Sequence, residues 1–173
     1  MPRFTRGLLT GLFVGPLVAA LFAVSGFWPV TAIPDPPWLE TMMARRALNA
    51  SVARQAPKVQ NPLAPSSDVL RAGLKVYRDG CSFCHGDYQK PSRWGTTAVY
   101  PRVSQFDSEP PDKPDWQMFW IVKNGVRYSG MGAWSGEIPD EKIWQVVTFL
   151  SRLRKLPPEV QADWTQQSKE RNP

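Results

Sequence analysis

The pentapeptide Cys81-Ser82-Phe83-Cys84-His85 contains both cysteines and the only histidine of the 173-residue chain. Cysteines three residues apart lie on one face of a helical turn, so both thiols can form thioether bonds to the vinyl groups of one haem. The histidine that follows can then bind the iron, because imidazole is a usual axial ligand of haem iron. Cys-x-x-Cys-His is the attachment pattern of c-type haem. It predicts one covalent haem c on Cys81 and Cys84, with His85 as an axial iron ligand.

Two other uses of paired cysteines fit the sequence poorly. A structural zinc site needs about four Cys or His ligands, and the chain has three such residues in total. A thioredoxin-like Cys-x-x-Cys belongs near a βαβ pattern, which the flanking sequence does not show. A disulfide is not expected, because haem attachment uses both thiols.

The net charge of +6 is concentrated before the haem motif. Basic residues exceed acidic ones by four before Ser67 and by two from Ser67 onward. Proteins that bind nucleic acid cluster their basic residues on one face or one helix, and no long basic run surrounds the motif. Nucleic acid is therefore not an expected partner.

A long uncharged segment near the N-terminus predicts a membrane anchor. Residues 7–33 carry no charged side chain. A helix needs roughly 20 apolar residues to cross a bilayer, whereas the apolar part of a secretory signal has only about 7–15. Residues 1–33 are therefore predicted to contain one uncleaved transmembrane helix in contact with membrane lipid. Covalent haem attachment is typical of the outer side of energy-transducing membranes, so the sequence predicts a single-pass protein of the bacterial inner membrane with its haem domain in the periplasm.

Residues 34–66 are predicted to join the anchor to the haem domain. Prolines at 34, 36 and 37 prevent continuation of a helix. Apolar residues at helical spacing then predict an amphipathic helix over residues 38–55. This helix could lie on a membrane surface, dock on a partner subunit or pack on the haem domain. Residues 56–66 contain three prolines and are predicted to be extended and semi-rigid.

The haem domain is predicted to be all-α. Ser67 and Asp68 suit the N-terminus of a helix over residues 68–79, and Gly80 ends it just before the motif. Further helices are predicted over residues 115–123 and 140–153, with loops over residues 86–114. Residues 158–173 are predicted to be a polar tail, from which Trp164 could pack back onto the domain.

Several short motifs of this region resemble those of the class I c-type cytochromes. They are Gly73-x-x-x-Tyr77, the haem motif followed by Gly86, Asn124-Gly125 and Gly130-Met131-Gly132-Ala133-Trp134. The resemblance covers about residues 67–157. It implies a small all-α domain that folds around the covalently attached haem, and it implies that Gly73 and Tyr77 meet the face formed by residues 144–149.

The resemblance also implies further site residues. Met131 matches the family's second axial ligand. Met118, inside a predicted helix, is the other methionine of the domain, and the absence of a second histidine excludes bis-histidine ligation within the chain. A proline carbonyl after the motif accepts the ring proton of the family's histidine, and Pro91 and Pro101 are the candidates. Side chains that could bind the haem propionates are Trp94, Tyr100, Arg102, Tyr128 and Trp134.

These features predict a membrane-anchored monohaem cytochrome that carries single electrons between redox partner proteins on the periplasmic side, for example in a respiratory chain. A His–Met pair leaves no open iron position, so no enzymatic activity and no small-molecule substrate are expected. A different possibility is a dedicated haem c subunit of a larger membrane respiratory or photosynthetic complex. A haem enzyme or gas sensor is disfavoured, because no histidine remains to act as a distal acid or base.

Overall fold

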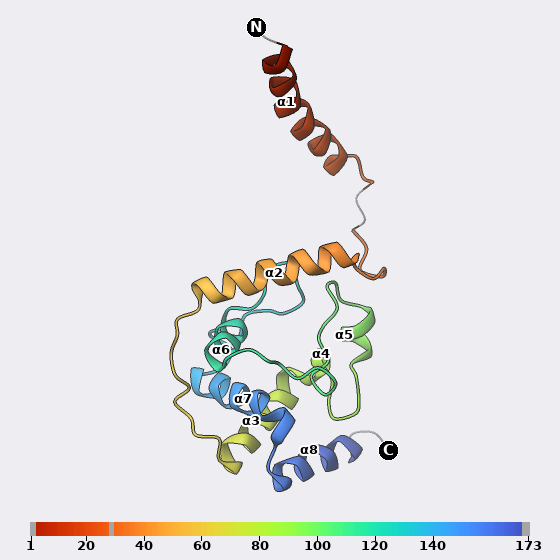
Figure 1. The fold of residues 1–173 in the computed structure, drawn as a ribbon. Helices are drawn as coiled ribbons and strands as arrows, with labels where there is room; N and C mark the ends of the chain where they lie inside the picture. The colour runs from red at the N-terminus through yellow and green to blue at the C-terminus, as the bar shows by residue number, and fades with distance from the viewer. Residues whose placement is uncertain (1–2, 28–29, 171–173) are drawn as a thin grey trace. The chain divides into compact units, whose positions relative to one another are not determined.

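The computed structural model describes residues 3–27 and 30–170, and it divides into two compact units, Met1–Thr31 and Ala32–Pro173 (Figure 1). Residues 28 and 29 of the predicted anchor and residues 171–173 of the predicted tail lie outside the described residues. The haem motif and every helix predicted after the anchor belong to the second unit.

The first unit contains helix α1 (Arg3–Val24). None of the helices in the described part of the chain is long and apolar enough to cross a membrane. The prediction of a transmembrane helix is therefore wrong, and so is that of a single-pass inner-membrane protein. The uncharged segment of the sequence extends to residue 33, but the helix already ends at Val24. Its uncharged part, residues 7–24, includes three glycines and Pro16 and is shorter than the roughly 20 apolar residues that a bilayer requires.

The second unit is built on three helices, α3 (Ser67–Gly80), α6 (Asp115–Asn124) and α7 (Asp140–Arg152). The helices predicted over residues 68–79, 115–123 and 140–153 are thus confirmed. Helix α3 packs on α7, and α6 packs on the same helix. Among the described residues β-pairing is limited to two isolated bridges, Asp87 with Lys90 and Ser135 with Ile138, which agrees with the predicted all-α class.

Helices α3 and α7 meet at a glycine. A Cβ atom on Gly73 would collide with the backbone carbonyl of Gln145 and would lie 2.7 Å from Cβ of Phe149. Only glycine permits so close an approach of two backbones. Beside it the rings of Tyr77 and Phe149 lie 5.8 Å apart. The contact that the family resemblance implied between these two faces is therefore present.

Helix α2 (Trp38–Gln55) packs on the haem domain, which was one of the three alternatives for this segment. Val52 is fully buried, and the Nζ of Lys113 donates to Oδ1 of Asn49 at 2.6 Å. Figure 1 shows α2 lying across α6. Residues 56–66 then connect α2 to α3 without helix or strand.

Four shorter or later elements complete the described part of the unit. Helices α4 (Ser82–His85) and α5 (Arg93–Thr97) form within and just after the haem motif, the second of them inside a predicted loop. A 3₁₀ turn, η1 (Leu153–Lys155), follows α7 and leads to α8 (Pro158–Glu170). The segment predicted as a polar tail is thus largely helical, and Val160 and Trp164 are buried in the core.

Candidate functional site

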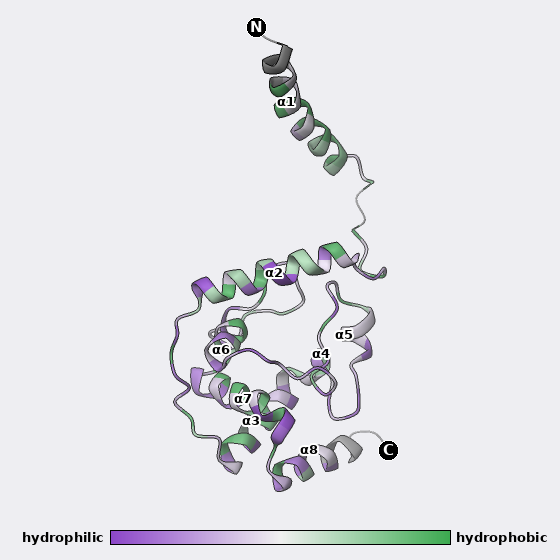
Figure 2. Cartoon of the chain, in the orientation of Figure 1, coloured by the Kyte–Doolittle hydropathy of each residue, from purple (hydrophilic) through white to green (hydrophobic). Residues whose placement is uncertain are grey.

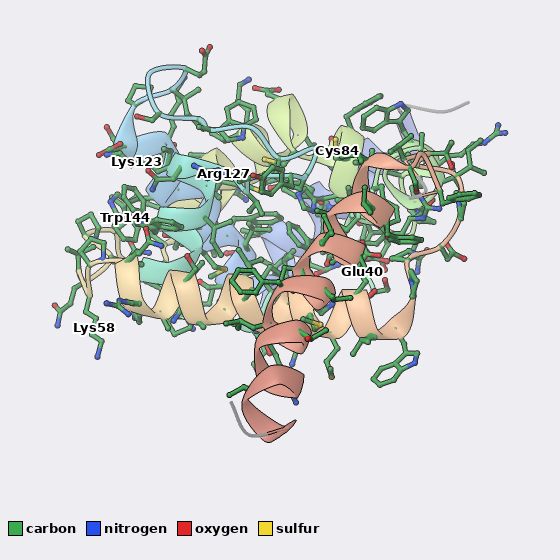
Figure 3. All side chains as sticks on the ribbon, turned by 90° about the horizontal axis from the view of Figure 1, so that it is seen from above. Glu40, Lys58, Cys84, Lys123, Arg127 and Trp144 are labelled. Atoms are coloured by element: carbon green, nitrogen blue, oxygen red, sulfur yellow. The ribbon has the colours of Figure 1, made fainter. Side chains whose placement is uncertain are left out.

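The two cysteines lie where α3 passes directly into α4. The amide of Cys81 still donates to the Tyr77 carbonyl at 2.8 Å, and the amide of His85 donates back to the Cys81 carbonyl at 2.9 Å. Cys81, Cys84 and His85 therefore share one short helical turn, as their spacing predicted. Both thiols are free and half-buried (Figure 3 labels Cys84).

The ring of His85 is oriented by a backbone carbonyl. Its Nδ1 lies 2.9 Å from the carbonyl oxygen of Ser104. A carbonyl only accepts hydrogen bonds, so Nδ1 carries the proton and Nε2 keeps the lone pair that a metal needs. Burial lowers the pKa of His85, against an opposing effect of the Ser104 carbonyl. The imidazole is therefore neutral near pH 7, in the tautomer that leaves Nε2 free.

The carbonyl that holds His85 comes from neither of the prolines that the family resemblance suggested. Pro91 and Pro101 are replaced in this role by Ser104. The segment that carries Ser104 also pairs with the motif directly, because the Phe106 amide donates to the His85 carbonyl at 3.1 Å. The Phe106 ring stacks on the imidazole with a centroid distance of 4.1 Å.

Cys81 has the environment of a protonated thiol. Burial, and secondarily the nearby Cys84, raise the pKa of Cys81 to about 12. A nucleophilic or redox-active cysteine needs a lowered thiol pKa, so Cys81 is unsuited to such chemistry. No group of three or more His, Cys, Asp or Glu side chains among the described residues could hold a metal ion. These residues suit thioether attachment and one imidazole ligand better than thiolate chemistry.

Gln105 links three parts of the site, and nothing in the sequence marked it. Its Nε2 donates to the Cys84 carbonyl at 3.1 Å and to the Val103 carbonyl at 2.9 Å. Its Oε1 accepts the Ser92 amide at 2.6 Å. The half-buried side chain of Gln105 thereby joins α4 to Ser92, which precedes α5. It also joins α4 to Val103, next to the residue that holds His85.

Helix α5 packs against α4, the short helix of the haem motif. A Cβ on Gly95 would collide with the Cys84 carbonyl. Ser92 caps α5, because its Oγ accepts the Gly95 amide at 2.9 Å, and the same Oγ donates to the Phe83 carbonyl at 2.5 Å. The Phe83 and Trp94 rings lie 5.5 Å apart on this surface.

Met131 lies in a loop that is fixed to the end of α6. Gly125, with φ +69°, ends the helix, and a Cβ there would lie 2.8 Å from the Met131 carbonyl oxygen. The loop returns to α6 through the Trp134 amide, which donates to the Val122 carbonyl at 3.2 Å. Met131 is half-buried and packs on the core, whereas Met118 is only 5% exposed inside α6 and belongs to the core itself.

The same loop reaches the haem motif. The ring of Trp134 lies so close to Gly80 that a Cβ on Gly80 would overlap its tip. Gly80 precedes Cys81, and Trp134 follows Met131 by three residues. The structure therefore brings the loop of the predicted second ligand into contact with the start of the attachment motif.

The residues named as possible propionate ligands have other partners or are exposed. Arg102 binds backbone carbonyls, and the hydroxyl of Tyr100 donates to Glu40. Tyr128 is 90% exposed. Trp94 packs on Phe83, and Trp134 packs on Gly80.

A buried ion pair holds the segment that follows His85. Nε of Arg78 lies 3.1 Å from Oδ2 of Asp87, with side-chain exposures of 2% and 13%. Nε1 of Trp164 donates to Oδ1 of Asp87 at 2.6 Å, and Nη2 of Arg78 donates to the Trp164 carbonyl at 2.5 Å. Helix α8 is thereby joined to α3 and to the end of the haem motif.

The residues present fit a covalent haem. Two half-buried thiols share one turn with an imidazole whose Nε2 is free, and the loop that carries Met131 contacts Gly80, the residue before Cys81. Residues 68–150 match the family model described as "Cytochrome C oxidase, cbb3-type, subunit III". The match is to a cytochrome c domain and is consistent with a class I c-type cytochrome over this segment. The resemblance drawn from the sequence is thus confirmed.

The chain also has a match among solved structures. A chain of a reducing HAO-like protein complex from Kuenenia stuttgartiensis aligns with a TM-score of 0.37 and 18% identity, over 56% of this chain and 50% of that chain. The aligned part thus spans half of that neighbour. None of the curated proteins matches the chain.

Proposed function

We propose that the cytochrome domain carries single electrons between redox partner proteins, with one haem c attached to Cys81 and Cys84 and with His85 and Met131 as axial iron ligands. The hydrogen bond from Nδ1 of His85 to the Ser104 carbonyl is the observation that supports this most directly. It fixes the tautomer and the orientation of the ring, as a hydrogen bond to the other ring nitrogen does for metal-binding histidines.

Each part of the site has a separate task in this proposal. Haem, when bound, would supply the one-electron chemistry. The Ser104 carbonyl holds the imidazole in place, and the contact of Trp134 with Gly80 keeps the Met131 loop closed over the motif. Two protein ligands leave no open position, so we expect neither a small-molecule substrate nor enzymatic activity. A Met/His pair also raises the reduction potential.

The dedicated subunit of a larger respiratory or photosynthetic redox complex is the second candidate. Trp38, Leu39 and Met43 on α2 are 75%, 48% and 61% exposed. Figure 2 shows hydrophobic and hydrophilic residues alternating along this helix. An exposed apolar group of this kind is typical of a protein interface. Co-purification of stable partner subunits would favour this candidate, and a single 19.5 kDa red protein would favour the free carrier.

The test is a comparison of the matured protein with a Met131→Ala variant. The wild-type chain should gain the mass of one haem and show the ferric absorption band of a thioether ligand. Met131→Ala should lose that band and have a lower midpoint potential, while Met43→Ala on α2 should keep both. A chain without added mass would disprove haem attachment, and an intact band in Met131→Ala would disprove the ligand assignment.

A further inference from the structure

Arg102 connects two distant segments of the chain. One is the loop of residues 97–104, here called the ligand loop because Ser104 holds His85. The other is residues 32–40, here called the strap, which leads into α2. The guanidinium donates to the carbonyls of Thr97 at 3.2 Å and Val99 at 2.9 Å in the ligand loop, and to those of Ala32 at 2.8 Å, Ile33 at 2.7 Å and Pro34 at 3.3 Å in the strap.

The guanidinium has no donor left for another partner. Its Nε lies 3.2 Å from Oδ1 of Asp35, in addition to the five carbonyls. An arginine has five N–H groups in a rigid fork, and all of them are used here. The side chain is 21% exposed, and hydrogen bonds from a charged donor are roughly twice as strong as neutral ones. The Arg102 guanidinium thus holds the first residues of the strap with every one of its donors.

A second contact joins the same two segments. The hydroxyl of Tyr100, in the ligand loop, donates to Oε1 of Glu40 at 2.5 Å. Glu40 is at the start of α2 and is labelled in Figure 3. The strap is therefore fixed near both of its ends to one short loop.

The ligand loop also contacts α5 and the haem motif. The Val103 amide donates to the Gly95 carbonyl at 3.0 Å, and the Ser104 carbonyl meets Nδ1 of His85 at 2.9 Å. Arg102 immediately precedes these two residues. A movement of Arg102 would accordingly displace the carbonyl that orients the imidazole.

We propose that Arg102 is a positioning residue that couples the strap to His85, so that residues 32–40 form part of the haem site although they lie outside residues 68–150, which match the family model. This inference rests on the proposed haem ligation by His85. A hydrogen bond at Nδ1 makes the imidazole a stronger donor at Nε2. A displaced Ser104 carbonyl weakens that bond, and the weaker donor stabilises the ferric state less, which raises the midpoint potential.

The experiment uses the full-length haem protein and the variants Arg102→Ala, Arg102→Lys and Asp35→Asn. Three quantities are measured: the rate at which a nonspecific protease cuts the strap, the hydrogen-exchange rate of the Val103 amide and the midpoint potential. For Arg102→Ala we expect the first two rates to rise about tenfold or more, because several hydrogen bonds are lost from a locally opening segment. The midpoint potential should rise in the same variant.

The other two variants show whether the branched guanidinium group of Arg102 matters, or only its positive charge and its ion pair with Asp35. Lysine keeps the charge, but a single ammonium group does not span both segments, so Arg102→Lys should behave like Arg102→Ala and also serves if the alanine variant does not accumulate. Asp35→Asn removes one contact to a carboxylate whose side chain is 90% exposed, and should change none of the three quantities.

Three results would overturn the proposal. A shifted potential with an uncut strap would show that Arg102 acts on the haem directly. A cut strap with unchanged Val103 exchange and potential would show a tether without influence on His85. If all three quantities were unchanged, the contacts of Arg102 would neither hold the strap nor position His85. A chain that matures without haem would instead overturn the proposed function, and the cutting and exchange rates would still decide whether Arg102 joins the strap to the ligand loop.

Discussion

The indole of Trp134 lies against the backbone of Gly80, so close that a side chain at position 80 would overlap the ring. This contact joins two segments that are far apart in the sequence, the end of α3 and the loop after α6. Because Cys81 follows the glycine and Met131 precedes the tryptophan by three residues, the contact sets how near the methionine loop approaches the attachment motif.

Gly80→Ala should therefore disturb Met131 ligation. The added Cβ would push Trp134 and its loop outward, since the nearest ring atoms leave no room for it. We expect the thioether-ligand absorption band of the ferric protein to weaken or disappear. Gly132→Ala is the matched control, because a Cβ there meets nothing within 4 Å. Equal spectra for the two variants would show that the contact does not position the ligand.

Asp87→Asn should destabilise the domain strongly. Removing the carboxylate charge leaves Arg78 buried with an incomplete set of partners, at a cost of about 3 kcal/mol in the free energy of unfolding. The control is Asp79→Asn, which removes an ion pair with Lys75 whose side chains are 62% and 76% exposed. Exposed pairs within a helix contribute only about 0.3–0.5 kcal/mol. Urea unfolding of both variants measures the difference, and similar midpoints would refute the role given to Arg78 and Asp87.

Asn61→Ala should loosen the extended segment between α2 and α3. The side-chain Nδ2 donates to Oδ2 of Asp115 at 2.8 Å and to Oγ1 of Thr148 at 2.9 Å, so it fixes this segment to both α6 and α7. Loss of these part-buried hydrogen bonds should cost about 1–3 kcal/mol of unfolding free energy. Asn49→Ala, which removes one exposed bond to Lys113, should cost much less. Thermal unfolding of the two variants gives the comparison.

Gln105→Ala should weaken the framework around the haem motif. It leaves the Ser92 amide and the Cys84 carbonyl without their side-chain partner, which should cost about 1–3 kcal/mol. We also expect faster hydrogen exchange of the Ser92 amide. Gln55→Ala provides the control, since Gln55 bonds only within its own helix, to Ser51. No difference in stability between these variants would mean that water replaces the Gln105 contacts.

Local signals predicted the parts of this protein that depend on a few neighbouring residues. The attachment motif and the helices over residues 68–79 and 140–153 depend on neighbouring residues, so the sequence is enough to identify them. The cap of α3 is Ser66, one residue before the predicted Ser67, because the Ser66 side chain accepts the Val69 amide. The family resemblance added the meeting of Gly73 with α7, which the structure shows, and Met131 as an axial ligand, which stays a prediction. The anchor prediction failed because an uncharged run does not reveal where its helix ends, and α1 ends at Val24, well before residue 33.

The sequence by itself limited the proposed haem attachment to Cys81, Cys84 and His85, because no other residues of this chain can supply two thioethers and an imidazole. The tertiary structure decided what orients and encloses those residues. Every residue has a backbone carbonyl, so no side chain could mark Ser104 as the partner of His85. The contacts of Gln105, Arg102 and Asn61, and the docking of α8 through Trp164, likewise join segments that are remote in sequence, and they exist only once the backbone has brought those segments together.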